Sequence, residues 1–241
     1  MRIDAGLVID WTQMPTYNTI MSVAAGAGLL TIVWLGLSLR SRQEAFNADG
    51  WAIALAAPGV VLFTTGLHMT LTWPFAKYFP FDNIIFGEPS LGFGVLLLLA
   101  ALYLWRRRVK LEDAESPGAE IARTARPLSI FVIGIGLSLI AIFFAGIVFQ
   151  LFAAPPEEPI SGAFSAYPWI EATFMSTLFA LVGVGAVLFP FTLRAMERGG
   201  AISVLQWIVG VAWTLAGIAF LLFGALNFFT HIGLITNTMS G

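Results

Sequence analysis

The sequence predicts an all-α membrane protein, a polytopic bundle of about six transmembrane helices with both termini outside. Of 241 residues, 58% are hydrophobic and only 11% are charged, whereas an average soluble domain has roughly 25% charged residues. Several apolar segments are also long enough to cross about 30 Å of hydrocarbon at about 1.5 Å of helix rise per residue. A soluble core cannot use so much apolar surface, so we expect a single transmembrane domain over residues 1–241.

Charged or proline-rich segments separate the expected spans. The spans are expected at 18–39, 51–74, 89–105, 127–153, 168–193 and 201–230. Residues 1–17 lack the basic start and short apolar core of a cleavable signal peptide, so we expect them to remain as an outer tail. The segment 106–126 is highly charged and contains a Ser-Pro-Gly break, which predicts a solvated cytoplasmic linker.

Basic residues divide unevenly between two sets of loops. One set contains ten Lys and Arg residues, and the other contains only Arg2 and Lys77. Because short cytoplasmic loops retain Lys and Arg, the first set is expected inside and both termini outside. This division predicts a multi-pass protein of a cell membrane, with a prokaryotic inner membrane favoured. The lipid bilayer is then its immediate partner.

Other features of the composition exclude several kinds of function. The chain contains no cysteine, which excludes disulfides, iron–sulfur clusters and thiolate metal sites. The HExxH, GxSxG and Walker patterns do not occur, and a net charge of −2 gives no indication of a nucleic-acid partner. These patterns identify no reaction, so whether the protein is an enzyme remains open.

The stretch 66–94 places polar groups where polarity costs free energy. It contains His68, one of two histidines, inside an apolar segment, and Glu88 in the sequence FGEP. His68 is a candidate metal or haem ligand or proton carrier; the alternative is a neutral imidazole hydrogen-bonded to a neighbouring helix. Glu88 is either a ligand or an acid at the positive end of a helix dipole, since Pro89 suits a first helical position.

Polar residues of other segments also concentrate towards the outer ends. His231 follows about thirty apolar residues, so it should reach the outer interface, with Asn227 one turn earlier on the same helix face. Glu171 follows a proline near the start of its span, where capping and a ligand role are both open. Asp82 and Asn83 are expected to form a turn in an outer loop.

Glycine pairs within the spans predict close helix packing. Gly92 with Gly94, Gly134 with Gly136, and Gly183 with Gly185 form small-residue faces of the kind that let membrane helices approach each other. None of these pairs follows a strand, so they give little support to a cofactor-binding loop.

Two motifs, TTGLHMTLTWPF and NIIFGEPSLGFG, resemble a family of bacterial and archaeal multispan proteins described only as a domain of unknown function. The resemblance covers most of the spans from about Trp51 onward. It implies a membrane fold of six or seven helices and no established activity, so no catalytic role is assigned from it.

The first functional hypothesis is a metal- or haem-binding site at the outer leaflet. His68 and His231 would supply nitrogen ligands to a divalent or redox metal, or to haem b, and Glu88, Glu171 and Asn227 would supply oxygen ligands or support them. Straight helices would leave the two imidazoles on the order of 10 Å apart in depth. A bis-histidine haem would therefore require a tilted helix, whereas a metal between His68 and Glu88 would not.

Two further hypotheses belong to other classes. The long apolar helices and the lack of a recognised motif are also expected of a non-catalytic subunit or scaffold, either a homo-oligomer or part of a larger membrane complex. A small-solute or proton pathway is the third hypothesis. It is disfavoured because conduction needs a polar lining across the whole membrane, and the inner halves of the spans are nearly apolar.

Overall fold

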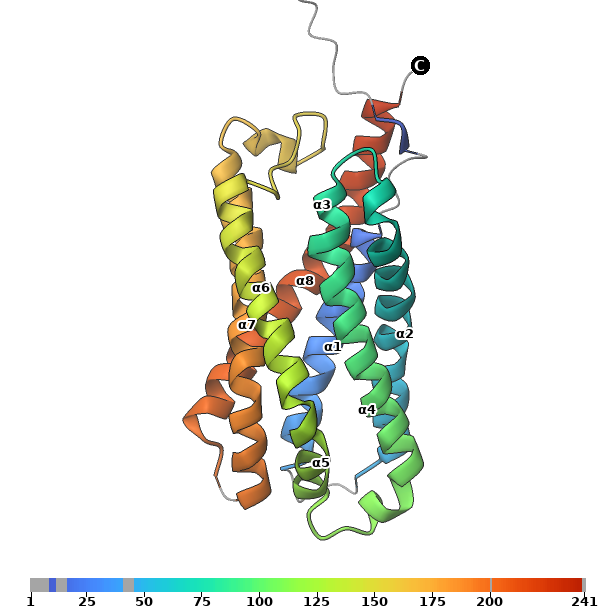
Figure 1. Ribbon diagram of the computed structural model, residues 1–241, viewed down its shortest axis with the longest axis vertical. Helices are drawn as coiled ribbons and strands as arrows, with labels where there is room; N and C mark the ends of the chain where they lie inside the picture. The colour runs from blue at the N-terminus through green and yellow to red at the C-terminus, as the bar shows by residue number, and fades with distance from the viewer. Residues whose placement is uncertain (1–8, 12–16, 41–45, 200, 240–241) are drawn as a thin grey trace, which may run out of the picture.

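A computed structural model describes residues 9–11, 17–40, 46–199 and 201–239 (Figure 1). Six helices in these ranges are long and apolar enough to cross a membrane, and the described residues contain no strand. The all-α membrane fold and the count of six spans are therefore confirmed. That residues 1–241 form one domain remains a prediction.

Long helices form the spans and short helical segments connect them. The long helices are α1 (Asn18–Ser38), α2 (Ala48–Thr72), α4 (Glu88–Glu112), α6 (Ser129–Phe149), α7 (Pro168–Arg198) and α8 (Val204–Thr238). The short ones are η2 (Trp73–Phe75), α3 (Pro80–Asp82), η3 (Asn83–Gly87), α5 (Pro117–Ala125), η4 (Arg126–Leu128) and η5 (Ser161–Phe164). A local cap sets the start of α8, where Ser203 and Gln206 form a reciprocal capping box.

The spans pack mainly as three pairs, α2 with α4, α6 with α7, and α1 with α8. Helix α1 also packs on α2, and α8 also packs on α7. The order of neighbours is therefore α4, α2, α1, α8, α7, α6, and the two end members, α4 and α6, touch only sparsely. Figure 1 shows the α2–α4 and α6–α7 hairpins on either side of α1 and α8. We call this arrangement the incomplete ring.

Several glycines lie where helix backbones come close. A Cβ on Gly26 of α1 would lie 2.5 Å from the backbone nitrogen of Leu221 on α8. Gly136 and Gly183 face each other across the α6–α7 interface, where a Cβ on either would lie 2.8 Å from the carbonyl oxygen of the other. Gly134, in contrast, has no neighbouring atom within 4 Å of that position. The predicted close packing is confirmed at Gly136 and Gly183 but is wrong for Gly134.

The third span is longer than the predicted range 89–105. Helical backbone runs from Pro80 to Glu112 through α3, η3 and α4. Pro89 cannot donate a hydrogen bond to the carbonyl four residues earlier and would crowd it in a regular α-helix. The π-helical turn η3, immediately before α4, accommodates this proline within a continuous helix.

Two local predictions in this span are therefore wrong. Asp82 and Asn83 do not form a loop turn, because they belong to the first turns of the helix that begins at Pro80. Glu88 does not mark a helix start, because helical backbone precedes it. A role for Glu88 at the positive end of a helix dipole has no support in this geometry.

The predicted solvated linker 106–126 is mostly helical. Helix α4 continues to Glu112, and α5 buries Gly118 and Ala122 against the bundle. Lys110 and Glu120 form an ion pair between α4 and α5, and Arg126 Nη1 lies 3.2 Å from Glu197 Oε2 of α7. The sequence did not predict helix here, because the exposed face of this segment is highly charged and its buried face is short.

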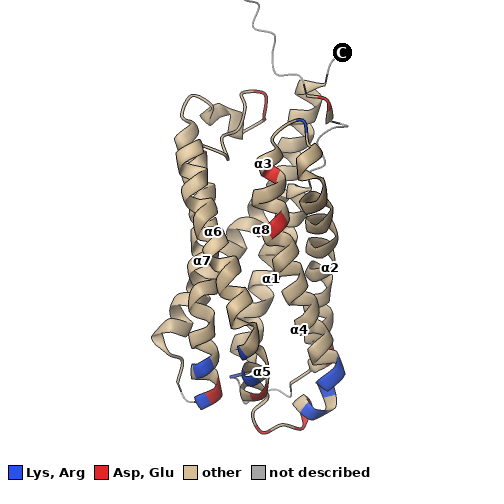
Figure 2. Ribbon diagram, viewed as in Figure 1, with Lys and Arg blue, Asp and Glu red and all other residues tan. Residues whose placement is uncertain are grey.

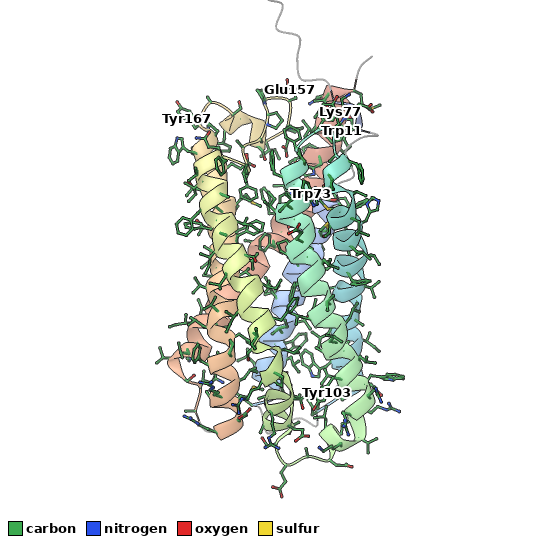
Figure 3. All side chains as sticks on the ribbon, in the orientation of Figure 1. Trp11, Trp73, Lys77, Tyr103, Glu157 and Tyr167 are labelled. Atoms are coloured by element: carbon green, nitrogen blue, oxygen red, sulfur yellow. The ribbon has the colours of Figure 1, made fainter. Side chains whose placement is uncertain are left out.

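The first and last described residues lie at the same end of the bundle. The Ile9 N–H donates to the Thr238 carbonyl at 3.3 Å, and Trp11 Nε1 donates to Thr238 Oγ1 at 3.1 Å. Figure 3 shows Trp11 and Glu157 at this end and Tyr103 near the opposite one. Apart from Lys77, which lies at the Trp11 end, Lys and Arg gather near the Tyr103 end (Figure 2). We call the Trp11 end the outer end in accordance with the charge distribution; its exposure to the outside remains a prediction.

Candidate functional site

A cavity of about 930 Å³ lies inside the incomplete ring. Side chains of α1, α4, α6, α7 and α8 line it, together with residues 150–155 and Glu158 of the loop between α6 and α7. Its middle is apolar, with Phe93 from α4, Leu139 from α6, and Trp213 from α8 among the lining residues. The spans therefore border a partly open space whose walls are mainly hydrophobic.

Polar groups gather at the outer end of this cavity and come from separate parts of the chain. Besides polar residues at the start of α1, they include Asp82, Gln150, Glu158, Glu171, Asn227 and His231. The side chain of Glu158 is 9% exposed, and Asn227 is 7% exposed. Buried polar groups in a membrane bundle require partners, so the interactions of each one define what the site can do. We call this set the outer polar cluster.

Glu158 faces the last helix from the loop between α6 and α7. Its Oε1 lies 3.7 Å from His231 Nε2, an ion pair only when the imidazole is protonated. Burial raises the pKa of Glu158; the nearby Thr230 hydroxyl opposes this effect, and the negative charge of Glu171 reinforces it. Thr230 Oγ1 makes no hydrogen bond of regular geometry, so its stabilisation of the Glu158 carboxylate is weak.

Glu171, in the first turn of α7, holds the preceding loop in place. Its Oε2 accepts a hydrogen bond of 2.8 Å from the Ala154 N–H, and the Ser161 hydroxyl also stabilises the carboxylate. A carboxylate that accepts from a backbone N–H forms a charge-assisted bond, which is stronger than a neutral one. Glu171 is therefore a structural anchor of the loop as well as a wall of the cavity.

The loop 150–167 crosses from the α6–α7 hairpin towards α8 (Figure 1). Asn237 Nδ2 of α8 donates to the Glu157 carbonyl at 2.8 Å, and a side chain at Gly233 would overlap Pro159. Figure 3 shows Glu157 at the top of this loop, between the hairpin and α8. Together with the Glu158–His231 contact, these interactions place the loop over the outer end of the cavity.

One residue of this loop has a strained backbone. Ile160 has φ 69° and ψ −68°, and the Ser161 N–H donates to the Pro159 carbonyl at 2.8 Å. These values describe a γ-turn with positive φ, a rare and strained conformation for a β-branched residue. Such strain persists only where surrounding contacts enforce it, here the contacts of the loop with α8.

Asn227 has an unsatisfied polar atom within the cavity wall. Its Oδ1 is buried and has no hydrogen-bond partner in the described structure. Leaving a buried acceptor unsatisfied costs about 1–3 kcal/mol. In native proteins a water, an ion or a ligand usually completes such a group, so Asn227 Oδ1 is available to accept a hydrogen bond from a further donor.

Aromatic rings lie inward of the outer polar cluster. The rings of Phe152 and Phe179 stack with centroids 5.3 Å apart, and Phe86 and Phe220 pack edge-on against this pair, with centroids 5.9 Å from Phe152 and Phe179 respectively. Phe179 lies eight residues, about 12 Å of helix rise, inward from Glu171. The polar part of the cavity is therefore backed by an apolar aromatic layer.

A second, smaller polar group lies at the inner end. Arg40 Nη2 donates to Gln206 Oε1 at 2.7 Å, and Gln206 Nε2 donates to the Thr192 carbonyl at 3.2 Å. All three residues line the same cavity. The inner halves of the spans are thus less apolar than the sequence indicated.

The structure brings together three of the five predicted site residues. Glu171, Asn227 and His231 line the cavity, whereas His68 and Glu88 do not. Both excluded side chains are exposed, and the ring of His68 packs 5.6 Å from that of Tyr17, centroid to centroid. The proposed metal between His68 and Glu88, and the bis-histidine haem, therefore lack support in the structure.

The described residues contain no group of three or more His, Asp or Glu side chains placed to hold a metal ion. The pair formed by Glu158 and His231 has two such side chains, whereas structural and catalytic zinc sites use at least three protein ligands. The predicted metal-binding property is accordingly not supported. The sequence analysis also missed Glu158. The only indication in the sequence is that Glu157 and Glu158 are adjacent acidic residues in a proline-rich outer loop.

Six apolar spans around a cavity define a polytopic α-helical membrane protein. Within this class, the family model described as "Protein of unknown function (DUF981)" matches residues 14–233, and the chain belongs to that family. The resemblance to an uncharacterised family is thereby confirmed. A comparison with curated proteins and another with solved structures found no match.

Proposed function

We propose that this protein binds an apolar or amphipathic small molecule from the bilayer, with the polar part of the ligand at the outer polar cluster. The observation that supports the proposal is the cavity, with about 930 Å³ of space, a hydrophobic middle and polar groups concentrated at one end. Small-molecule sites are typically concavities of roughly 300–1,000 Å³ with apolar walls and a few polar groups that fix orientation.

We propose that the ligand enters the cavity between α4 and α6, which touch only sparsely. Lining residues come from both of the sparsely touching helices, including Phe93 and Leu96 of α4 and Val132 and Leu139 of α6. The loop 150–167 lies over the outer end, and Arg40 with Gln206 occupies the inner end. A ligand dissolved in the hydrocarbon would then reach the cavity by lateral entry between α4 and α6.

This proposal keeps an outer polar site and assigns it no metal or haem. Only His231 of the two histidines contributes to the cavity, and a carboxylate–imidazole pair alone does not complete a coordination sphere. The same groups are well suited to orient a ligand by hydrogen bonds, because each supplies an acceptor or donor inside an apolar surrounding.

Photolabelling in nanodiscs tests the proposal. The full-length chain is reconstituted in phosphatidylcholine and exposed to a neutral dodecanol probe that carries a diazirine at its chain end, and labelled residues are mapped by mass spectrometry. We expect labels on cavity residues such as Phe93 and Phe179. Labels confined to lipid-facing residues would refute the proposal.

A matched pair of substitutions sharpens this test. Leu139 lines the cavity and is 6% exposed, whereas Leu137 on the same helix is 56% exposed. Leu139→Trp fills part of the cavity and should reduce cavity labelling several-fold, while Leu137→Trp adds the same ring to the lipid-facing surface and should leave it unchanged. Equal labelling of the two variants would contradict a site inside the ring.

A solute or proton pathway is a second candidate, because the cavity lining extends from Glu158 to Arg40 and Gln206. A continuous polar lining is required for conduction, and the aromatic layer around Phe179 interrupts it. Proton flux into liposomes measured for the wild-type chain and for Glu171→Gln distinguishes the two functions. A flux that exceeds empty liposomes and falls in the variant supports conduction, and a flux equal to that of empty liposomes removes this candidate.

A further inference from the structure

Three carboxylates from three separate elements reach the outer end of the cavity. Asp82 comes from α3, Glu158 from the loop, and Glu171 from α7. Among the described lining residues, Arg40 is the only Lys or Arg, and it lies at the inner end. His231 is the only other basic side chain in the described lining. The outer end therefore has an excess of acidic groups.

The geometry within this cluster leaves one buried acceptor, Asn227 Oδ1, without a donor. Glu171 acts on Glu158 through its negative charge, so the two carboxylates repel each other in a partly buried place. Asn227, more than nine-tenths buried in the same wall, has an unpartnered Oδ1. The Asn227 amide is an observation separate from the acidic groups, because it belongs to another helix, α8, and its unpartnered atom is a neutral oxygen.

We propose that the ligand carries a cationic, hydrogen-bond-donating head group of the alkylammonium type, which binds among Glu158, Glu171 and Asn227. The apolar chain of the ligand then lies against the aromatic layer and the middle of the cavity. This inference rests on the proposed function and narrows it to cationic amphiphiles.

The chemistry of an ammonium group matches the cluster. An ammonium offers three donors and no acceptor, which suits two carboxylates and an amide oxygen. A cation beside buried carboxylates offsets both their mutual repulsion and the cost of removing them from water. An anionic head group would add to the repulsion, and a purely apolar ligand would leave Asn227 unsatisfied.

Probes that differ only in the head group test this inference. Diazirine-labelled dodecylammonium, dodecyl sulfate and dodecanol are added to the same phosphatidylcholine nanodiscs, and cavity labelling is normalised to the amount of each probe in the membrane. Because hydrogen bonds to charged groups are the stronger ones, we expect dodecylammonium to label the cavity about tenfold more than dodecyl sulfate, since each tenfold step corresponds to about 1.4 kcal/mol.

Variants then identify the residues responsible. The double variant Glu158→Gln/Glu171→Gln should lose most of the preference for the cation. Glu88→Gln removes an exposed carboxylate of α4 that lies outside the cavity, so it should retain the preference. Melting temperatures of all variants report whether each one is folded, and the comparison of the three probes on the wild-type chain needs no variant.

The outcomes separate this inference from the proposed function. Equal cavity labelling by all three probes would overturn the cationic head group and leave the binding site in place. Preference for the sulfate probe would do the same. Failure of every probe to label the cavity would overturn both. A cation preference that survives in the double variant would assign it to other groups and refute the residues named here.

Discussion

Glu171 illustrates how one side chain serves both the fold and the site. Its Oε2 accepts the Ala154 N–H at 2.8 Å, and the side chain also borders the cavity. This charge-assisted hydrogen bond holds the loop together with the stacking of Phe152 on Phe179 and the contacts of the loop with α8. Replacing the Glu171 side chain should therefore change the stability of the chain, which thermal unfolding measures.

Substitution of Glu171 by leucine should destabilise the chain by about 1–3 kcal/mol, because the Ala154 N–H is left without its acceptor. Glu171→Gln keeps a side-chain acceptor and should cost less. Thermal unfolding in detergent micelles measures both, with Glu88→Leu as the control for loss of an exposed carboxylate. Equal melting temperatures for Glu171→Leu and the wild-type chain would contradict the anchoring role.

The loop 150–167 lies over the outer end of the cavity, and we call this its closed position. Glu158 should make the stability of this closed position depend on pH. Burial raises its pKa, so the closed loop binds the proton more tightly than an open loop with the ordinary value of about 4.3. The stabilisation is complete below that ordinary value and is lost as pH rises through the raised one. The charged groups that face Glu158 are His231 and Glu171, and protonation of His231 would favour the ionised carboxylate.

Spin labels can follow this loop, because the native chain contains no cysteine. Labels at Ala163→Cys in the loop and Thr236→Cys on α8, both exposed, report the separation of the two elements. We expect the distance to lengthen or broaden as pH rises from about 4 to about 8. The same pair in a Glu158→Gln background should show no such change; a wild-type response that persists there would assign it to another group.

At the scale of the element, hydropathy located the six spans, but it could not orient them about their axes. In a soluble helix the apolar face points inward, whereas in a bilayer the lipid-facing and packed faces are both apolar. His68 was therefore placed in a polar site, although α2 presents it to the outside of the bundle. Asn227 and His231 were found because polar residues stand out in α8.

Segments with mixed polarity were the ones missed. Helices α3 and η3 carry Asp82 and Asn83 in a stretch with prolines and aromatics, which also resembles an interfacial loop. The burial of these residues depends on contacts with distant parts of the chain, which local sequence does not encode. Glu158 was missed for the same reason, since only the crossing of its loop to α8 brings it to the cavity.

Close packing of α1 on α8 gives a prediction with a control on the same helix. A Cβ at Gly26 would collide with the backbone of Leu221, which cannot move aside as a flexible side chain can. Gly26→Ala should therefore destabilise the chain by about 1–3 kcal/mol, the usual cost of overpacking. Gly36→Ala, with no atom within 4 Å, should be neutral or stabilising by up to about 1 kcal/mol. Chemical or thermal unfolding of both variants measures the difference, and equal effects would be inconsistent with this interface.

At the scale of the whole molecule, the separation of charge predicts which end faces the cytoplasm. The described Lys and Arg residues other than Lys77 gather at the end opposite Trp11 (Figure 2), and cytoplasmic loops are the ones that retain such residues. A membrane-impermeant maleimide should label Ala163→Cys in intact cells and Glu115→Cys only after permeabilisation. The reverse pattern would invert the topology and place the outer polar cluster inside.

The incomplete ring also bears on which phase would supply the proposed ligand. If the proposed ligand enters from the hydrocarbon between the sparsely touching helices α4 and α6, its occupancy follows its mole fraction among lipids rather than its concentration in water. Amphiphiles accumulate strongly in a bilayer. Their high concentration there would fill such a site even if the site bound them only weakly. The protein would then respond to the composition of the leaflet around it, and a change in membrane lipids alone would alter its state.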